Sequence, residues 1–390
     1  LKIPHLTEGL DEEVRKRTES PEVALLAYVV ALLPTHDVSA AGTRDVLATL
    51  APDLPDGTVR ELIEAEVSRR LHTLLVEAYR DQQRVDPAIL ASLESEIEPD
   101  QATLTVVHTT RYSYATPVER SSHRFCLKPV NDERQRLLEH DLHISVDGMD
   151  REFEDVFGNR ARQLEVVQPF TEMVVESRSK LGVEGVLASQ LKSALRRDQI
   201  PRVWMPWQRQ MMQAYLMPEE LPEPELRELS EFGMSFVERN DYDLVETLLD
   251  LNRTIYRDFT YVPGSTNVES RPVQVYAHRK GVCQDFAHLA IGCLRSYGLA
   301  ARYISGYIET LPAPGVPRLV GADASHAWFS VFVPGTGWLE FDPTNNSLPS
   351  DQHITLGWGR DYSDVTPLKG IAYGGGEHEL SVSVDVLRLE

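Results

Sequence analysis

The sequence contains little cysteine. Only Cys126, Cys283 and Cys293 occur in a chain of 390 residues, which is too few for a disulfide framework. Such sparse use is typical of a reducing compartment, so we expect a cytoplasmic protein. Long apolar runs are missing as well. The longest, VALLAYVVALL at residues 23–33, is too short for a membrane-spanning helix, and the acidic residues before it are unlike a secretory signal.

Positive charge is also scarce. Lys and Arg number 39 against 60 Asp and Glu, which gives a formal net charge of -21. Nucleic-acid binding without sequence preference depends on a basic surface, and anionic membranes attract basic segments. The composition therefore argues against a nucleic-acid partner and against a membrane partner.

Residues 1–98 have helical periodicity. Ser20-Pro21 has the form of a helix N-cap followed by proline at the first helical position, and a second apolar stripe begins after Thr58. We find no catalytic motif in this region. Two interpretations stay open: a helical module that docks a partner or a second copy of the chain, and a passive cap.

The periodicity changes near residue 102. Alternating and β-branched segments follow, with the turn DVFGN between two of them, so we predict an antiparallel β domain over 102–182. Residues 183–225 are irregular and rich in proline, and we interpret them as a linker. Helices are predicted at about 226–239 and 242–257, and they open a third unit that spans 226–390.

The segment GVCQDFAHLAIGCLRSYG, residues 281–298, places a cysteine at the start of a predicted helix. Apolar residues recur at helical spacing after Cys283, and Gly298 is positioned to end the helix as a C′ residue. Unpaired N–H groups and the positive dipole of a first helical turn favour a thiolate and can hold an oxyanion. Cys283 is therefore a candidate nucleophile. Cys293 lies about 15 Å further along the helix, so we interpret it as a small buried hydrophobic residue, as we do Cys126.

A nucleophilic cysteine needs a base and a group that orients the base. The segment SHAWFSVFVPGTGWLEFDPTNN, residues 325–346, has two alternating strands joined by a Pro-Gly turn. His326 and Asp342 are 342 − 326 = 16 residues apart, so a hairpin centred on Pro334 would pair them directly, with Cβ atoms about 5 Å apart. This pairing needs an odd-length loop or a bulge, because an even loop would put them on opposite faces. We predict His326 as the base and Asp342 as its orienter.

The other histidines fit this role less well. His288 follows Cys283 by five residues, which is about 140° around the helix, so it would point away from the thiol. His278 precedes the cysteine without a carboxylate strand to hold it. His353 and His378 lie in sequence that resembles loops.

These residues resemble the transglutaminase-like superfamily of papain-like thiol enzymes, in particular its bacterial branch with a β domain before the catalytic core. The motifs are Gly-x-Cys-x-Asp, His-Ala-Trp and Asp-Pro-Thr, in that order, and the resemblance covers about 102–390. It implies an α+β fold: a papain-like core with a helix on an antiparallel sheet, preceded by an antiparallel β domain and an N-terminal helical domain. By resemblance, Cys283 is the nucleophile, His326 the base and acid, and Asp342 the orienter.

Further residues are candidates for the substrate or oxyanion site. The backbone N–H of Cys283 is the first oxyanion donor, with Tyr261 and Gln284 as helpers. Trp328 either forms a wall of the acyl site or packs in the core. The segment GWGRDYSDV, residues 357–365, is predicted to be a glycine-hinged loop in which Arg360, Asp361 and Tyr362 either touch substrate or form a structural turn.

The predicted chemistry is acyl transfer through a thioester of Cys283, on a peptide or protein substrate that carries an amide carbonyl. Hydrolysis, as in a cysteine peptidase or amidase, is the preferred outcome. The alternatives are protein-glutamine γ-glutamyl transfer to an amine, and a binding scaffold whose thiol is inert. This chemistry needs no cofactor and no metal, and the sequence has no calcium-loop pattern.

Overall fold

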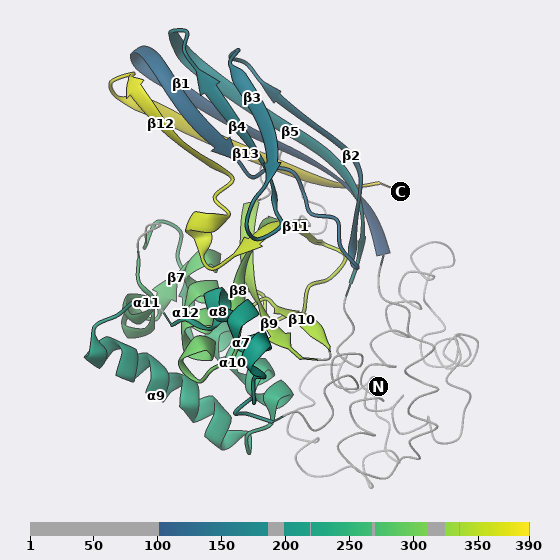
Figure 1. Ribbon diagram of the computed structural model, residues 1–390, viewed down its shortest axis with the longest axis vertical. Helices are drawn as coiled ribbons and strands as arrows, with labels where there is room; N and C mark the ends of the chain where they lie inside the picture. Colours follow the sequence, from purple (N-terminus) through teal and green to yellow (C-terminus); the bar gives the residue numbers. More distant parts are fainter. Residues whose placement is uncertain are drawn as a thin grey trace, which may run out of the picture. The chain divides into compact units, whose positions relative to one another are not determined.

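The computed structural model describes residues 101–185, 199–218, 220–266, 270–310, 324–334 and 336–389. The predictions for residues 1–98 therefore lie outside the described residues. The described part has the α+β character expected from the sequence, because both of its larger sheets are antiparallel and helices pack against the smaller of the two (Figure 1).

The larger sheet is organised around one long strand, β1 (Gln101–Phe125). Its first half pairs with β5 and β13 and its second half with β4 and β12, while β2 pairs with β5 and β3 with β4. The bounds of these strands are β2 (Gln135–Ile144), β3 (Met149–Glu154), β4 (Arg160–Val166), β5 (Phe170–Glu184), β12 (Leu368–Gly374) and β13 (His378–Leu389).

The third unit was predicted to span 226–390, but its last two strands, β12 and β13, pair with β1 of the larger sheet. Figure 1 shows β12 and β13 lying with the β domain, beside β1. Val384 and Val386 of β13 are buried against Leu104 and Val106 of β1. The alternation in SVSVDV is visible in the sequence, but the partner strand is more than 250 residues away, and a local pattern cannot identify it.

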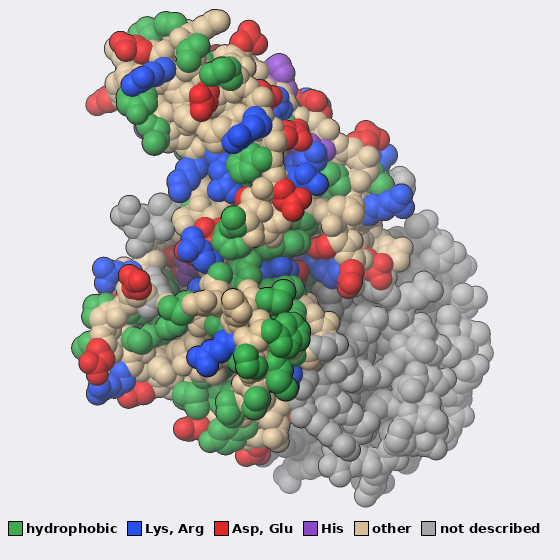
Figure 2. All heavy atoms as spheres, in the orientation of Figure 1, with side chains coloured by type: hydrophobic (Ala, Val, Ile, Leu, Met, Phe, Trp, Pro, Cys, Tyr) green, Lys and Arg blue, Asp and Glu red, His purple; other side chains and the backbone are tan. Residues whose placement is uncertain are grey.

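The predicted linker also contains structure. Its first residues, up to Glu184, belong to β5, and two short helices, α7 (Pro206–Met211) and α8 (Gln213–Leu216), follow later. Pro206 occupies the first position of α7, where its missing N–H costs nothing. Met205, Trp207, Met211 and Met217 are more than half exposed, and Figure 2 shows hydrophobic side chains gathered over α7 and α8.

The smaller sheet has the strand order β10-β9-β8-β11. Its strands are β8 (Ala301–Ile308), β9 (Ala324–Val333), β10 (Gly337–Phe341) and β11 (His353–Gly359), and the helices of this unit are α9 (Glu223–Arg239), α10 (Leu244–Asp258), α11 (Pro272–His278) and α12 (Cys283–Ser296). The predicted helices at 226–239 and 242–257 correspond to α9 and α10. None of the described helices is long and apolar enough to cross a membrane.

Helix α12 is the centre of this unit. Its predicted apolar stripe is buried, with Phe286, Ala290 and Leu294 at most 2% exposed. This stripe shares a core with Tyr303 of β8 and Phe329 of β9, so the helix is packed against the sheet. Gly298 has a φ of +82° just after the helix, which confirms its predicted place as the residue that ends it. Packing on both sheet strands and a glycine stop fix the position of the helix, and with it the position of Cys283.

Candidate active site

Cys283 is the first residue of α12, and a carboxylate fixes the start of that helix. Asp285 Oδ2 accepts a hydrogen bond from the N–H of Val282 at 2.8 Å and another from Thr266 Oγ1 at 2.5 Å. Gly281 makes room for this carboxylate, since a Cβ at that position would lie 2.9 Å from Asp285 Oδ2. The spacing Gly-x-Cys-x-Asp therefore has a steric and a hydrogen-bonding reason.

His326 and Asp342 meet, although by a different register from the one predicted. Val333 pairs with Gly337 and Phe329 with Phe341, so the hairpin is centred one residue beyond Pro334, and His326 is not directly opposite Asp342. The connection has three residues, 334–336, which keeps the odd loop length that the prediction required. His326 and Asp342 therefore remain on one face as a diagonal pair, and His326 Nε2 lies 2.8 Å from Asp342 Oδ2.

Asp342 is fully buried and held by five donors. Its Oδ1 accepts the backbone N–H groups of Thr344 at 2.9 Å and Asn345 at 3.2 Å. Its Oδ2 lies 2.7 Å from Asn345 Nδ2 and contacts two histidines. Burial alone would raise the pKa of Asp342, but the charge and hydrogen bond of His326 and the hydrogen bond of His353 outweigh it and lower that pKa well below its usual range. The group is a carboxylate at neutral pH.

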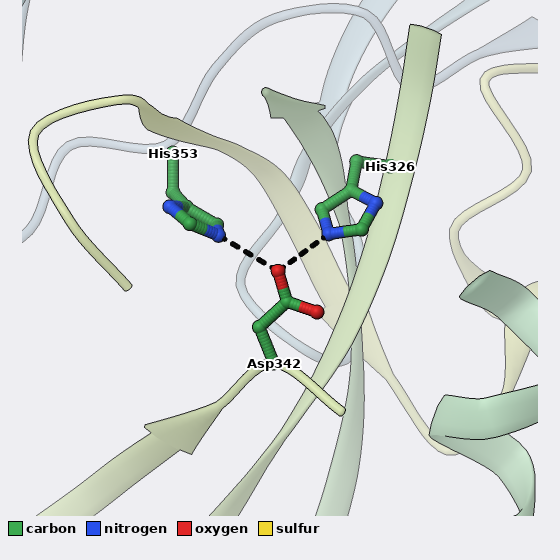
Figure 3. Close-up of side chains that lie close together, drawn as sticks. All are labelled: His326, Asp342 and His353. Atoms are coloured by element: carbon green, nitrogen blue, oxygen red, sulfur yellow. Dashed lines mark hydrogen bonds and ion pairs between the residues drawn. The ribbon is translucent and has the colours of Figure 1, made fainter. Parts of the chain in front are cut away.

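The second ring nitrogen of His326, Nδ1, points away from Asp342 (Figure 3). Burial would lower the pKa of His326, yet the charge and hydrogen bond of Asp342, followed by a hydrogen bond with Cys283, raise it to about 10. His326 is only 7% exposed. The imidazole is therefore a cation at neutral pH, bonded to a buried carboxylate and near enough to Cys283 for that thiol to contribute to its raised pKa.

A third side chain, His353, completes this cluster and was not predicted. Figure 3 shows His326 and His353 approaching Asp342 from two sides, with His353 Nε2 3.0 Å from Asp342 Oδ2. His353 opens β11, which pairs with β8, so its place follows from long-range strand pairing. The alternation in HITLGW was the one local signal that could have placed it on a strand instead of a loop.

His326, Asp342 and His353 each offer one ligand atom, and these atoms lie within 4.8 Å of one another. Two histidines and a carboxylate are a ligand set that zinc and iron use. Here, however, both imidazoles already bond to the same carboxylate oxygen, and the other nitrogen of His353 accepts a backbone N–H. The donor set is internally satisfied, so we do not interpret it as a metal centre.

Two of the predicted oxyanion helpers lie beside the nucleophile. Tyr261 pairs with Gly281 across β6 (Thr260–Tyr261) and β7 (Lys280–Gly281), and it is 49% exposed. Burial raises the pKa of Tyr261, and the charge of Cys283 adds to this effect. Gln284 follows Cys283 in the first turn of α12 and is half-buried. Tyr261 therefore lies near the thiol through the pairing of β6 with β7, and Gln284 is the next residue after Cys283 in the chain.

The other predicted residues have structural partners of their own. Trp328 is fully buried, stacks at a tilt 5.8 Å from the His326 ring, and donates from Nε1 to Glu340. Arg360 is bound to Asp364, and Asp361 caps the turn Tyr362–Asp364. Part of the predicted loop is strand, because β11 runs through Gly359. The N–H of Tyr362 donates to His288 of α12 at 3.2 Å, so this turn packs beside the nucleophile helix.

Cys126 and Cys293 are buried, at 5% and 0% exposure, as predicted. Burial raises the pKa of both thiols. Cys283 is the cysteine of the three that is partly exposed.

Comparison with protein families finds two matches along the chain. Residues 104–181 match the bacterial transglutaminase-like N-terminal region, and residues 233–343 match the transglutaminase-like superfamily. The first covers most of the sheet strands β1 to β5, and the second includes Cys283, His326 and Asp342.

The chain is also similar to individual proteins. An uncharacterized protein of Mycobacterium tuberculosis is 40% identical over 73% of this chain and 92% of its own length. A protein-glutamine gamma-glutamyltransferase of Pseudomonas aeruginosa is 31% identical over 32% of this chain and 20% of its own length. Among solved structures, a cysteine protease candidate from Cytophaga hutchinsonii shares the fold, with a TM-score of 0.60, 19% identity, and coverage of 75% of this chain and 93% of that one. The chain belongs to the transglutaminase-like superfamily, whose members are typically thiol enzymes.

Proposed function

We propose that this protein is a thiol-dependent acyl-transfer enzyme that acts on amide bonds through a thioester of Cys283, and that its usual outcome is hydrolysis. The observation that carries the proposal is the position of His326. Its ring bonds to the buried carboxylate of Asp342 through Nε2, and the partly exposed Cys283 is near enough to contribute to its raised pKa. This is the arrangement of nucleophile, base and orienter that covalent catalysis requires.

In the first step, the Cys283 sulfur attacks the amide carbonyl carbon, so that an S–C bond forms and the carbonyl π electrons move to oxygen. The tetrahedral oxyanion then re-forms the carbonyl and the C–N bond breaks. His326 gives its proton to the departing amine. In the second step, His326 takes a proton from water, the water oxygen bonds to the acyl carbon, and the S–C bond breaks. The thiolate and the imidazolium are restored, and the product is a carboxylic acid.

The oxyanion would lie at the start of α12. Backbone N–H groups in a first helical turn have no partner within the helix, and the helix dipole adds positive potential there. Asp285 fixes the start of the helix at Cys283, and Gly281 leaves room for its carboxylate. The N–H groups therefore keep a fixed position relative to the sulfur. We propose Tyr261, which pairs with Gly281, and Gln284, which follows Cys283, as side-chain helpers.

Water is our preferred acceptor because the described surroundings of the thiol are open. Tyr261, which pairs beside the start of α12, is half exposed, and Cys283 itself is partly exposed. An enzyme that transfers its acyl group to an amine must keep water from the thioester, since water is present in large excess. The alternative, transfer from glutamine to an amine, is supported by the similarity to a protein-glutamine gamma-glutamyltransferase over 133 residues.

The test is a competition between acceptors. The full chain is incubated with a peptide library that contains glutamine, together with a labelled primary amine. From hydrolysis we expect ammonia or new peptide termini, with no label incorporated into the peptides. Stable incorporation of the label would favour the transferase. Cys283→Ala is the control and should abolish both products. Turnover that survives Cys283→Ala would refute the thioester mechanism.

A further inference from the structure

We propose that His353 is a positioning residue of this active site, which holds Asp342 in place from the side opposite His326. The functional unit then has four side chains, because His353 joins Cys283, His326 and Asp342. The expected effect of His353 on the reactivity of Cys283 rests on the proposed function. The hydrogen bonds of His353 do not depend on any substrate. His353 comes from β11, outside the matched core region, which ends at residue 343.

The hydrogen bonds of His353 fix its tautomer. Its Nδ1 lies 3.1 Å from the backbone nitrogen of Ser350 and must accept that N–H. A neutral imidazole that accepts at Nδ1 carries its proton on Nε2. Nε2 is 3.0 Å from Asp342 Oδ2, so His353 donates to the carboxylate.

The surroundings keep His353 neutral. It is 2% exposed, and burial lowers its pKa in spite of the hydrogen bond and charge of Asp342. The charges of His326 and Arg134 act in the same direction as burial. His353 therefore supplies a hydrogen-bond donor without adding a second positive charge, and the full charge of Asp342 remains available to His326.

The position of His353 in the sheet is equally constrained. Gly306 of β8 pairs with His326 on one side and with Thr355 on the other, so β8 separates the two histidine-bearing strands. A Cβ at Gly306 would lie 2.5 Å from the indole of Trp328. That indole packs against both histidine rings, at 5.8 Å from His326 and 5.3 Å from His353. Asp342 thus lies between two imidazoles that both pack against the indole of Trp328.

The experiment compares His353→Leu, which removes the donor, with His353→Gln, whose amide nitrogen can replace Nε2. Nitrogen-15 NMR of histidine-labelled full-length protein reports the tautomer of each ring, and the alkylation rate of Cys283 by iodoacetamide reports the thiolate. In the wild type, we expect His353 to be neutral and protonated at Nε2 between pH 7 and 8. We expect His353→Leu to slow alkylation by ~10-fold through displacement of the Asp342–His326 pair, and His353→Gln to recover at least about a third of the wild-type rate.

His108→Leu is the matched control. His108 is also a buried histidine, 2% exposed and bonded to Tyr307 and Thr110, but it lies in the β domain. Its loss should lower stability without slowing alkylation. If His353→Leu does not fold, the wild-type tautomer and His353→Gln still decide the question.

Three results would overturn the proposal. One is a His353 that is charged or protonated at Nδ1, and another is an alkylation rate in a folded His353→Leu equal to that of the wild type. The third is tight binding of Zn²⁺ by the wild type that His353→Gln abolishes, which would make the cluster a metal site. A wild-type Cys283 that is inert to iodoacetamide while His353 has the expected tautomer would refute the proposed function and leave the hydrogen-bond geometry standing.

Discussion

His326 Nε2 lies 2.8 Å from Asp342 Oδ2, although the two residues are not paired across the β9–β10 hairpin. The contact is diagonal, and it is made inside the protein, where Asp342 is fully buried and His326 nearly so. A buried ion pair loses much when one partner is removed, because the other charge is left without compensation. We therefore expect the same two residues to affect both the reactivity of the thiol and the stability of this part of the fold.

Removal of the Asp342 charge should affect both properties. Asp342→Asn keeps the shape of the side chain but has only one oxygen. If that oxygen accepts the backbone N–H groups, the NH₂ group faces the two histidine donors. If it faces the histidines, the backbone N–H groups lose their acceptor. We expect amide turnover to fall by roughly 10³–10⁴-fold. We expect Asp342→Ala to lose in addition about 3–5 kcal/mol of the free energy of unfolding, measured by urea denaturation.

Glu309→Gln is the control for this prediction. Glu309 is another buried carboxylate in an ion pair, with Arg388 at 2.7 Å, and it lies outside the site. Its substitution should lower stability and leave turnover unchanged. Equal turnover in Asp342→Asn and the wild type would contradict the role assigned to Asp342.

The pKa of His326, raised from 6.5 to about 10, predicts a pH dependence of stability. A group whose pKa is higher in the folded state contributes its full stabilisation below the unfolded value and loses it as the pH rises through the folded value. The difference in free energy of unfolding between the wild type and His326→Gln should therefore be largest below pH 6.5 and shrink toward pH 10. Denaturation series at pH 6, 8 and 9.5 measure it, and a difference that grows with pH would count against the raised pKa.

Gly281→Ala should lower both stability and activity. The added methyl group would lie 2.9 Å from the Asp285 carboxylate, which anchors the start of α12 at Cys283. We expect a cost of about 1–3 kcal/mol from overpacking and a loss of turnover of up to ~10²-fold, because the sulfur and the helix N–H groups shift together.

Gly182→Ala provides the comparison for Gly281→Ala. Gly182 lies in β5 and has open space where a Cβ would go. Its substitution should change neither the melting temperature nor turnover beyond small effects. Equal behaviour of the two alanine variants would mean that the close approach at Gly281 does not position the nucleophile.

The two cysteines of α12 should separate catalysis from stability. Cys283 is partly exposed at the first turn, so Cys283→Ala should abolish turnover with little change in melting temperature. Cys293 is fully buried against Leu229, so Cys293→Ala should leave turnover intact and cost about 1 kcal/mol through lost packing. Calorimetry and a turnover assay on both variants check this, and a reversed pattern would remove Cys283 from the mechanism.

The parts of the site that depend on local sequence were predictable. The helix from Cys283 and its end at Gly298 follow from apolar spacing and from one glycine, and both are observed. The contact between His326 and Asp342 was predicted because side chains alternate with a period of two, so any odd loop keeps both on one face. The centre of the hairpin was displaced because Pro334 begins the loop instead of lying at its middle.

The parts that depend on long-range pairing were not predictable in the same way. His353 reaches Asp342 only because β11 pairs with β8. Likewise, β13 belongs to the larger sheet because it pairs with β1. Both strand pairings depend on packing between segments that are far apart in the chain. The alternation of a strand specifies which side chains face inward, but it contains no information about which neighbour the strand selects.

The central claim is that Cys283 is the nucleophile and that His326 activates it. The most direct measurement is the rate of Cys283 carbamidomethylation at pH 6, followed by peptide mapping, in the wild type and in His326→Gln. The buried Cys126 and Cys293 serve as unreactive internal references. We predict that the wild-type rate exceeds that of free cysteine by at least about tenfold and that His326→Gln removes the excess. A wild-type rate no higher than that of free cysteine, or one unchanged in His326→Gln, would contradict the account.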